Sequence, residues 1–256
     1  MVTDPAEAPL KGRMLFYQQP ELLSVEEHGS LGLIRPERAY EYAATAKAIP
    51  VTAREFSTAQ KYYPIVFSNP NDPVPVAVTG IDDKNLFVDE NGRWQNHCYV
   101  PAYLRCYPLT VASSPDGNAA VVVDRTAAHV SANPDQPFFD GKELTEGMKA
   151  LVDFCSQYDA ERRQTIEFGK RLKELELLTG QQATQQFQGE EPQTIASYTA
   201  IDARKLRELD PGVLQELFKN GSLSMIYAHL FSLENWQRLI ERRALLTNPS
   251  PPPAQH

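Results

Sequence analysis

The chain has 256 residues, of which 42% are hydrophobic and 23% are charged, and its formal net charge is -8. An acidic chain has no basic surplus with which to neutralise phosphates, so electrostatic binding of nucleic acid is not expected. No apolar run approaches the roughly 20 residues that span a bilayer, and the N-terminus lacks the basic start and apolar core of a cleaved signal.

The three cysteines, Cys98, Cys106 and Cys155, are too few and odd in number for a disulfide framework. We therefore expect a reducing compartment, the cytoplasm. Residues 1–13 and 247–256 are small, polar and proline-containing, and are expected to form a disordered lead and tail.

Short apolar runs dominate the first half of the chain. A helix is predicted over Pro36–Ala48, which has proline in its first turn and Pro50 after its end. The Asn91-Gly92 pair predicts a tight hairpin turn, and Val121–Asp124 reads as a buried strand. Between these points, turn residues separate three apolar runs in the pattern of a strand meander: Tyr62–Phe67, Val74–Thr79 and Leu86–Val88.

The second half changes to helical spacing. Apolar residues from Thr145 to Leu178 recur with the period of one long helix, for which Gly180 is the expected stop and Gly169 a candidate break. Four further elements are predicted: a glutamine-rich loop at 181–193, a strand over Thr194–Ile201, a helix from Asp210 to Gly221, and an extended segment over Leu223–Leu230. Ser232 is then expected to cap a last helix.

The predicted strands and helices do not alternate regularly along the chain, which favours the α+β class. We expect a strand-rich N-terminal half, forming a meander or a partly closed sheet. It should pack against the long helix and a C-terminal strand-helix unit.

The sequence contains no phosphate loop, dinucleotide fingerprint or nucleophile elbow, and no cofactor is predicted. The nearest approach to a metal-ligand set is His97 and Cys98 with Cys106 and His129. Adjacent residues on a strand point to opposite faces, so buried thiols and an edge histidine are the favoured interpretation.

An aromatic segment after the hairpin supplies candidate binding residues. Trp94 and Tyr99 are candidates for the wall of a pocket, although a core role is the alternative. Arg105 is flanked by apolar residues and would need a carboxylate or a ligand anion if buried.

His229 lies in an apolar segment and is expected to be buried and hydrogen-bonded to Ser232 or Asn235. Either it is a neutral histidine that fixes a strand-to-helix corner, or it contacts a ligand beside Arg105. The predicted binding set is Trp94, Tyr99, Arg105, His229 and Asn235.

Several segments together resemble the bacterial SapC family, named after a protein associated with surface-layer systems. They are Tyr62–Phe67, Phe87–Trp94, Tyr99–Pro108, Ile201–Leu206 and Asn220–Asn235. The resemblance spans roughly Glu27 to Arg243, which implies one domain over 14–246. It carries no catalytic residues over to this chain.

The leading hypothesis is a non-enzymatic accessory or binding protein with a peptide, small-ligand or protein partner. The resemblance implies a setting in surface-layer, uptake or tailoring systems. The alternative is a metal-assisted enzyme that uses some of four histidines, His28, His97, His129 and His229. The sequence leaves the oligomeric state open.

Overall fold

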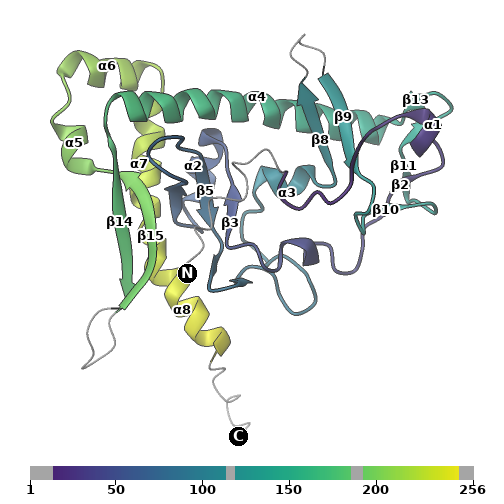
Figure 1. Ribbon diagram of the computed structural model, residues 1–256, viewed down its shortest axis with the longest axis horizontal. Coiled ribbons are helices and arrows are strands. Elements are labelled where there is room, and N and C mark those ends of the chain that lie inside the picture. The colour runs from purple at the N-terminus through teal and green to yellow at the C-terminus, as the bar shows by residue number, and fades with distance from the viewer. Residues whose placement is uncertain (1–13, 114–118, 186–192, 248–256) are drawn as a thin grey trace, which may run out of the picture.

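The computed structural model describes residues 14–113, 119–185 and 193–247 (Figure 1). The expected disordered lead and all but the first residue of the expected tail lie outside these ranges. The helices are α1 (Val25–His28), α2 (Phe56–Ala59), α3 (Ala102–Cys106), α4 (Glu146–Glu174), α5 (Ala203–Arg207), α6 (Pro211–Lys219), α7 (Ser222–Ser232) and α8 (Asn235–Thr247), with the 3-10 helices η2 (Glu41–Ala43) and η3 (Ala53–Glu55).

The strands are short apart from two. They are β1 (Pro20–Leu22), β2 (Gly32–Leu33), β3 (Ala48–Pro50), β4 (Ile65–Phe67), β5 (Pro75–Val78), β6 (Gly80–Ile81), β7 (Lys84–Asn85), β8 (Leu109–Ser113), β9 (Ala119–Asp124), β10 (Val130–Ser131), β11 (Gln136–Pro137), β12 (Phe139–Asp140), β13 (Glu143–Leu144), β14 (Leu178–Gln185) and β15 (Gln193–Ile201). The predicted α+β class is confirmed: several small antiparallel sheets lie in the N-terminal half, and a long helix and further strands and helices follow.

The largest sheet has five antiparallel strands in the order β14-β15-β4-β5-β3. Its centre comes from the predicted meander, because Ile65–Phe67 pairs with Pro75–Val78 and every residue of both strands is buried. The third run, Leu86–Val88, forms no strand. Val88 makes a single bridge to Trp94 across the predicted turn, where Gly92 has a φ of +65°.

Helix α4 crosses the whole molecule and borders two apolar clusters (Figure 1). Phe168 and Leu172 pack into the cluster around the five-stranded sheet. Met148 and Cys155 pack into the second cluster, with Leu109 of β8. The N-terminal half therefore packs against the long helix, as predicted, while the single-domain expectation stays a prediction.

Helix α4 starts as predicted, with Thr145 at its N-cap, but its C-terminal end differs from the prediction. The helix stops at Glu174, and Glu176 adopts a φ of +53°, so the chain turns four residues before Gly180. Gly180 lies in β14, which runs on into the stretch predicted as a glutamine-rich loop. That part of the loop prediction was wrong, because β15 supplies the backbone partners that an isolated polar strand lacks; residues 186–192 lie outside the described ranges.

The predicted helix over Pro36–Ala48 is reduced to η2. The carbonyls of Ala43 and Ala44 accept hydrogen bonds from the Asn85 side chain and backbone, at 3.1 and 2.8 Å. Carbonyls used in this way are not available to continue a helix.

The extended segment predicted over Leu223–Leu230 is also wrong, because these residues lie in helix α7. Apolar residues occur on every side of the segment, and such a short run does not distinguish strand from helix. Helix α7 packs Ile226 and Ala228 into the core. Ser232 ends α7 instead of capping the last helix, which begins at Asn235.

Candidate functional site

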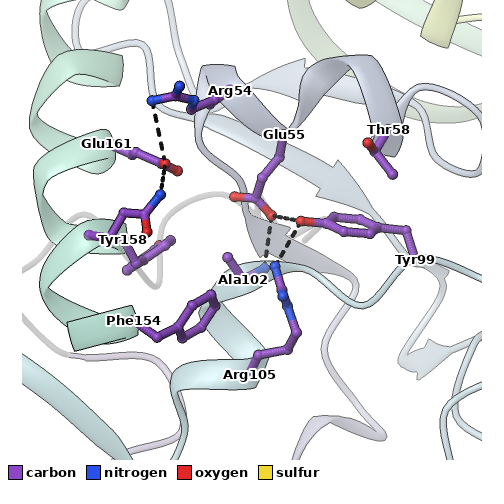
Figure 2. A pocket seen from close by; sticks show the side chains of 10 residues that line it. Arg54, Glu55, Thr58, Tyr99, Ala102, Arg105, Phe154, Tyr158 and Glu161 are labelled. Atoms are coloured by element: carbon purple, nitrogen blue, oxygen red, sulfur yellow. Dashed lines mark hydrogen bonds and ion pairs between the residues drawn. The ribbon is translucent and has the colours of Figure 1, made fainter. Parts of the chain in front are cut away.

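A cavity of about 180 Å³ opens where η3, α2, α3 and α4 meet (Figure 2). It lies beside the contact between α3 and α4, and its lining includes residues that pack in both apolar clusters. Its walls are formed by Arg54, Glu55, Thr58, Tyr99, Ala102, Arg105, Phe154, Gln157, Tyr158 and Glu161.

Glu55 is the buried polar centre of this site. Thr52 and Glu55 form a capping box at the start of η3, in which Glu55 Oε2 accepts from the Thr52 backbone N at 2.7 Å. The other carboxylate oxygen, Oε1, accepts from the Ala102 backbone N at 2.8 Å and from the Tyr99 hydroxyl at 2.9 Å. One carboxylate therefore caps η3 and also fixes the start of α3, so its oxygens are already occupied by protein donors.

Arg105 lies one helical turn after Ala102 and points into the same region (Figure 2). Its Nη2 donates to the Tyr99 hydroxyl at 3.1 Å. Its Cζ atom lies 4.8 Å from the Phe154 ring centroid and 5.6 Å from that of Tyr99. Within the described residues, no carboxylate lies within ion-pair distance of Arg105. Arg105 is exposed, so the condition of burial in its prediction is not met; its guanidinium contacts the Phe154 ring and the ring and hydroxyl of Tyr99.

The opposite wall carries Glu161 on α4. Its Oε1 accepts from Gln157 Nε2 at 3.0 Å and lies 3.8 Å from Nη1 of Arg54. The Glu161 side chain is 14% exposed and Arg54 is 72% exposed, so this pair lies at the mouth. The cavity therefore presents a positive group on one side and a partly paired carboxylate on the other.

Two phenols in the wall stay protonated at neutral pH. Burial, followed by the charge of Glu55, raises the pKa of Tyr99 well above its usual value. The same two causes raise the pKa of Tyr158. A protonated Tyr99 donates to Glu55 and accepts from Arg105, which is the arrangement seen.

The structure brings two of the five predicted binding residues, Tyr99 and Arg105, to this cavity. Trp94 is 7% exposed and packs with Phe87, their ring centroids 6.0 Å apart and nearly parallel. It therefore occupies the core position that was its alternative interpretation.

His229 and Asn235 also lie in the interior, away from the cavity lining. The expected bonds from the His229 ring to Ser232 or Asn235 are not formed; instead its Nε2 accepts from the Ile201 backbone N at 3.0 Å. Burial lowers the pKa of His229 to about 4. The Asn235 side-chain amide faces three carbonyls, those of Gln60, Tyr63 and Ser232.

The histidines that were proposed as metal ligands contact different neighbours. His28 contacts Glu21, at 3.2 Å, while His129 packs between Tyr42 and Tyr107. Across residues 14–113, 119–185 and 193–247, no three His, Cys, Asp or Glu side chains form a group that could hold a metal ion.

Sequence reasoning missed Glu55, Phe154 and Glu161 as site residues. Two signals were present. Thr52 and Glu55 have capping-box spacing. Phe154, Gln157, Tyr158 and Glu161 follow the i, i+3, i+4, i+7 pattern of one helix face. Neither signal reveals that the two segments face each other.

The SapC family model matches residues 23–239, which is most of the chain. The chain matches no curated protein and no solved structure at a significant level. No helix among the described residues is long and apolar enough to cross a membrane.

Proposed function

Because this chain belongs to the SapC family, whose pattern covers residues 23–239, we propose that it is a non-catalytic binding protein. Its ligand would carry a carboxylate, as a small organic acid or the end of a peptide does, and would place that group against Arg105. The accessory role in surface-layer, uptake or tailoring systems is a hypothesis that rests on the resemblance alone. The cytoplasm is the proposed compartment because the three cysteines are free thiols.

The observation that carries this proposal is that no carboxylate of the described residues lies within ion-pair distance of the Arg105 guanidinium. A guanidinium offers five donors in a planar fork that matches a carboxylate. Tyr99 takes one of these donors, and the guanidinium carbon lies over the Phe154 ring. The fork is therefore preorganised, which reduces the entropy lost on binding.

The volume of the cavity limits the size of the ligand. Pockets for whole drug-sized ligands usually measure about 300–1,000 Å³. A cavity of about 180 Å³ suits a small acid or one end of a longer chain. Glu161 on the far wall would favour a ligand that also carries a donor or a positive charge.

The test is thermal unfolding of the full chain with a panel of small carboxylates, including succinate, glutamate and glycyl peptides. A ligand at a hundredfold excess over its Kd stabilises the folded state by about 2.7 kcal/mol, which raises Tm by about 5–11 °C for a chain of this size. We expect this rise for the wild type and not for Arg105→Ala.

Arg207→Ala is the matched control, because Arg207 is exposed on α5 and its loss changes the net charge equally. Stabilisation of Arg105→Ala by the same carboxylate, to the same extent as the wild type, would contradict the proposal. So would a panel in which no carboxylate shifts the wild-type Tm.

A further inference from the structure

Tyr158 carries a hydroxyl that the protein itself does not use. Its side chain leaves α4 in the wall of the cavity and is 8% exposed (Figure 2). Among the described residues, none donates a hydrogen bond to this hydroxyl or accepts one from it. The oxygen is also not enclosed within the protein, as the unpaired ring nitrogens of Trp94 and His129 are. The hydroxyl is therefore accessible from the cavity that Tyr158 lines.

An unpaired hydroxyl on a buried side chain is unusual. Buried polar groups are nearly always hydrogen-bonded, because leaving one unpaired costs free energy. The neighbouring phenols follow this rule: Tyr99 donates to Glu55 Oε1 at 2.9 Å, and Tyr103 donates to the Leu15 carbonyl at 2.7 Å. The Tyr158 ring packs against the Tyr103 ring, with centroids 6.1 Å apart, but its hydroxyl has no such acceptor. This hydroxyl is thus free to bind a ligand.

Tyr158 lies one helical turn from the ring that contacts Arg105. Phe154 and Tyr158 are separated by four positions on α4, so they follow one another on the same face, about 6 Å apart along the helix axis. The Arg105 Cζ atom lies 4.8 Å from the Phe154 ring centroid. A ligand with its carboxylate at Arg105 can therefore place its following atoms alongside Tyr158.

The surroundings of Tyr158 favour an uncharged group of the ligand. Burial and the charge of Glu55 raise the pKa of Tyr158 well above its usual value, so the hydroxyl keeps its proton and can donate it. Its ring belongs to the apolar cluster that also holds Met148 and Cys155. A second charge on the ligand would lose its hydration there without a free counter-charge, because both Glu55 oxygens already accept from protein donors. The group that fits is a neutral acceptor, such as a ketone or amide oxygen.

We propose that Tyr158 determines which carboxylates bind, by donating a hydrogen bond to a neutral carbonyl oxygen of the ligand. This inference rests on the proposed function, in which Arg105 receives the carboxylate. The ligand class is an acid with a carbonyl group three bonds beyond its carboxyl carbon, a span of about 4 Å. Keto acids of this kind and the C-terminal ends of peptides share this chemistry. An acid that lacks the carbonyl would bind through Arg105 alone.

The test compares three acids of similar length, pentanoate, 4-oxopentanoate and N-acetylglycine, whose Kd values for the full chain are measured by titration calorimetry. The wild type should bind the two carbonyl acids about five- to tenfold more tightly than pentanoate, the factor expected for one hydrogen bond. Tyr158→Phe should bind all of them with the affinity of pentanoate. Tighter binding of N-acetylglycine than of 4-oxopentanoate would point to peptide ends, and the reverse order to keto acids; either order agrees with the proposal.

Tyr158→Phe should fold, because it removes no hydrogen bond of the protein, and its Tm without ligand should equal or exceed that of the wild type. Tyr103→Phe is the matched control. It removes a hydroxyl from the neighbouring ring, but one that already donates to the Leu15 carbonyl. This control should lower the Tm without ligand and keep the preference for the carbonyl acids.

The outcomes separate this inference from the proposed function. If none of the acids bound, or if Arg105→Ala bound them as tightly as the wild type, the proposed function would fail and this inference with it. If binding depended on Arg105 but the wild type did not distinguish the carbonyl acids from pentanoate, only the role of Tyr158 would be overturned. The same holds if Tyr158→Phe kept the wild-type preference.

Discussion

Glu55 and Ala102 are 47 residues apart, and Glu55 Oε1 accepts a hydrogen bond from the Ala102 backbone N at 2.8 Å. This bond ties η3 to α3 and sets the direction in which Arg105 leaves α3. The same carboxylate oxygen holds Tyr99, the phenol that contacts Arg105. One buried side chain thus connects local capping to the geometry of the candidate site.

Glu55→Gln should destabilise the protein and weaken the site. Both carboxylate oxygens accept bonds, so an amide NH₂ must face a donor on one side. We expect a loss of about 2–4 kcal/mol in the free energy of unfolding, measured in urea, because bonds to a buried charged group are lost. The rise in Tm that an added carboxylate causes should also become smaller in this variant.

Glu167→Gln is the control for this change. Glu167 pairs with Lys170 on the exposed side of α4, and such pairs contribute little. Its loss should cost under about 0.5 kcal/mol. Equal costs for the two variants would show that Glu55 does not act as described.

His229→Gln should reduce the dependence of stability on pH. Burial lowers the pKa of His229 to about 4, below the value of about 6.5 for an unfolded histidine. Below pH 6.5 the unfolded state binds a proton that the folded state excludes, so stability is complete above that pH and falls as the pH drops toward 4. The His229 contribution lost between pH 7 and pH 5 is about 2 kcal/mol.

The measurement is urea unfolding at a series of pH values. The side-chain oxygen of the introduced glutamine can still accept from the Ile201 backbone N, so the variant should fold. Burial also lowers the pKa of His129, which adds a similar slope to both proteins. His97→Asn is the control for the loss of one histidine side chain, because His97 is exposed and asparagine tolerates its φ of +63°. A slope unchanged in His229→Gln would contradict the prediction.

Gly169→Ala should destabilise α4 although alanine favours helices. A Cβ atom at this position would lie 2.4 Å from the Pro73 carbonyl oxygen, which belongs to the backbone. The overlap should outweigh the gain of about 1 kcal/mol in helix propensity and leave a net loss of about 1–3 kcal/mol.

Gly180→Ala is the comparison for Gly169, because a Cβ there meets nothing within 4 Å. Thermal unfolding of both variants is sufficient to distinguish the sites. If Gly169→Ala were as stable as the wild type, the close approach of α4 to Pro73 would be wrong.

Elements with a complete local signal were predictable from the sequence. Helix α6 begins where Asp210 accepts a hydrogen bond from the Gly212 backbone N. The Asp210-Pro211 pair predicted this start from the sequence. Helix α4 and strands β4, β5 and β15 also follow from apolar periodicity. For these elements, neighbours in the chain carry most of the information.

The candidate site was predictable only in part. Arg105 was predicted because a cation among apolar residues needs a partner if it is buried, and Tyr99 because aromatic residues line pockets. In the structure Arg105 is exposed, but both residues line the cavity. Glu55 could not, because its partners Tyr99 and Ala102 come from a distant segment. His229 was predicted to be buried, which is correct, but its contact with Ile201 depends on α7 lying against β15.

The sequence by itself determined the α+β class, the first two strands of the meander, the long helix and the capped start of α6, because these depend on side-chain period and on bonds within a few residues. The tertiary structure decided that Leu223–Leu230 is helical and that 181–185 is a strand. An apolar run suits either conformation until it meets a surface, and a polar strand forms when another strand satisfies its backbone. It also decided where α3 and α4 cross, and that crossing is what places Arg105 against Phe154.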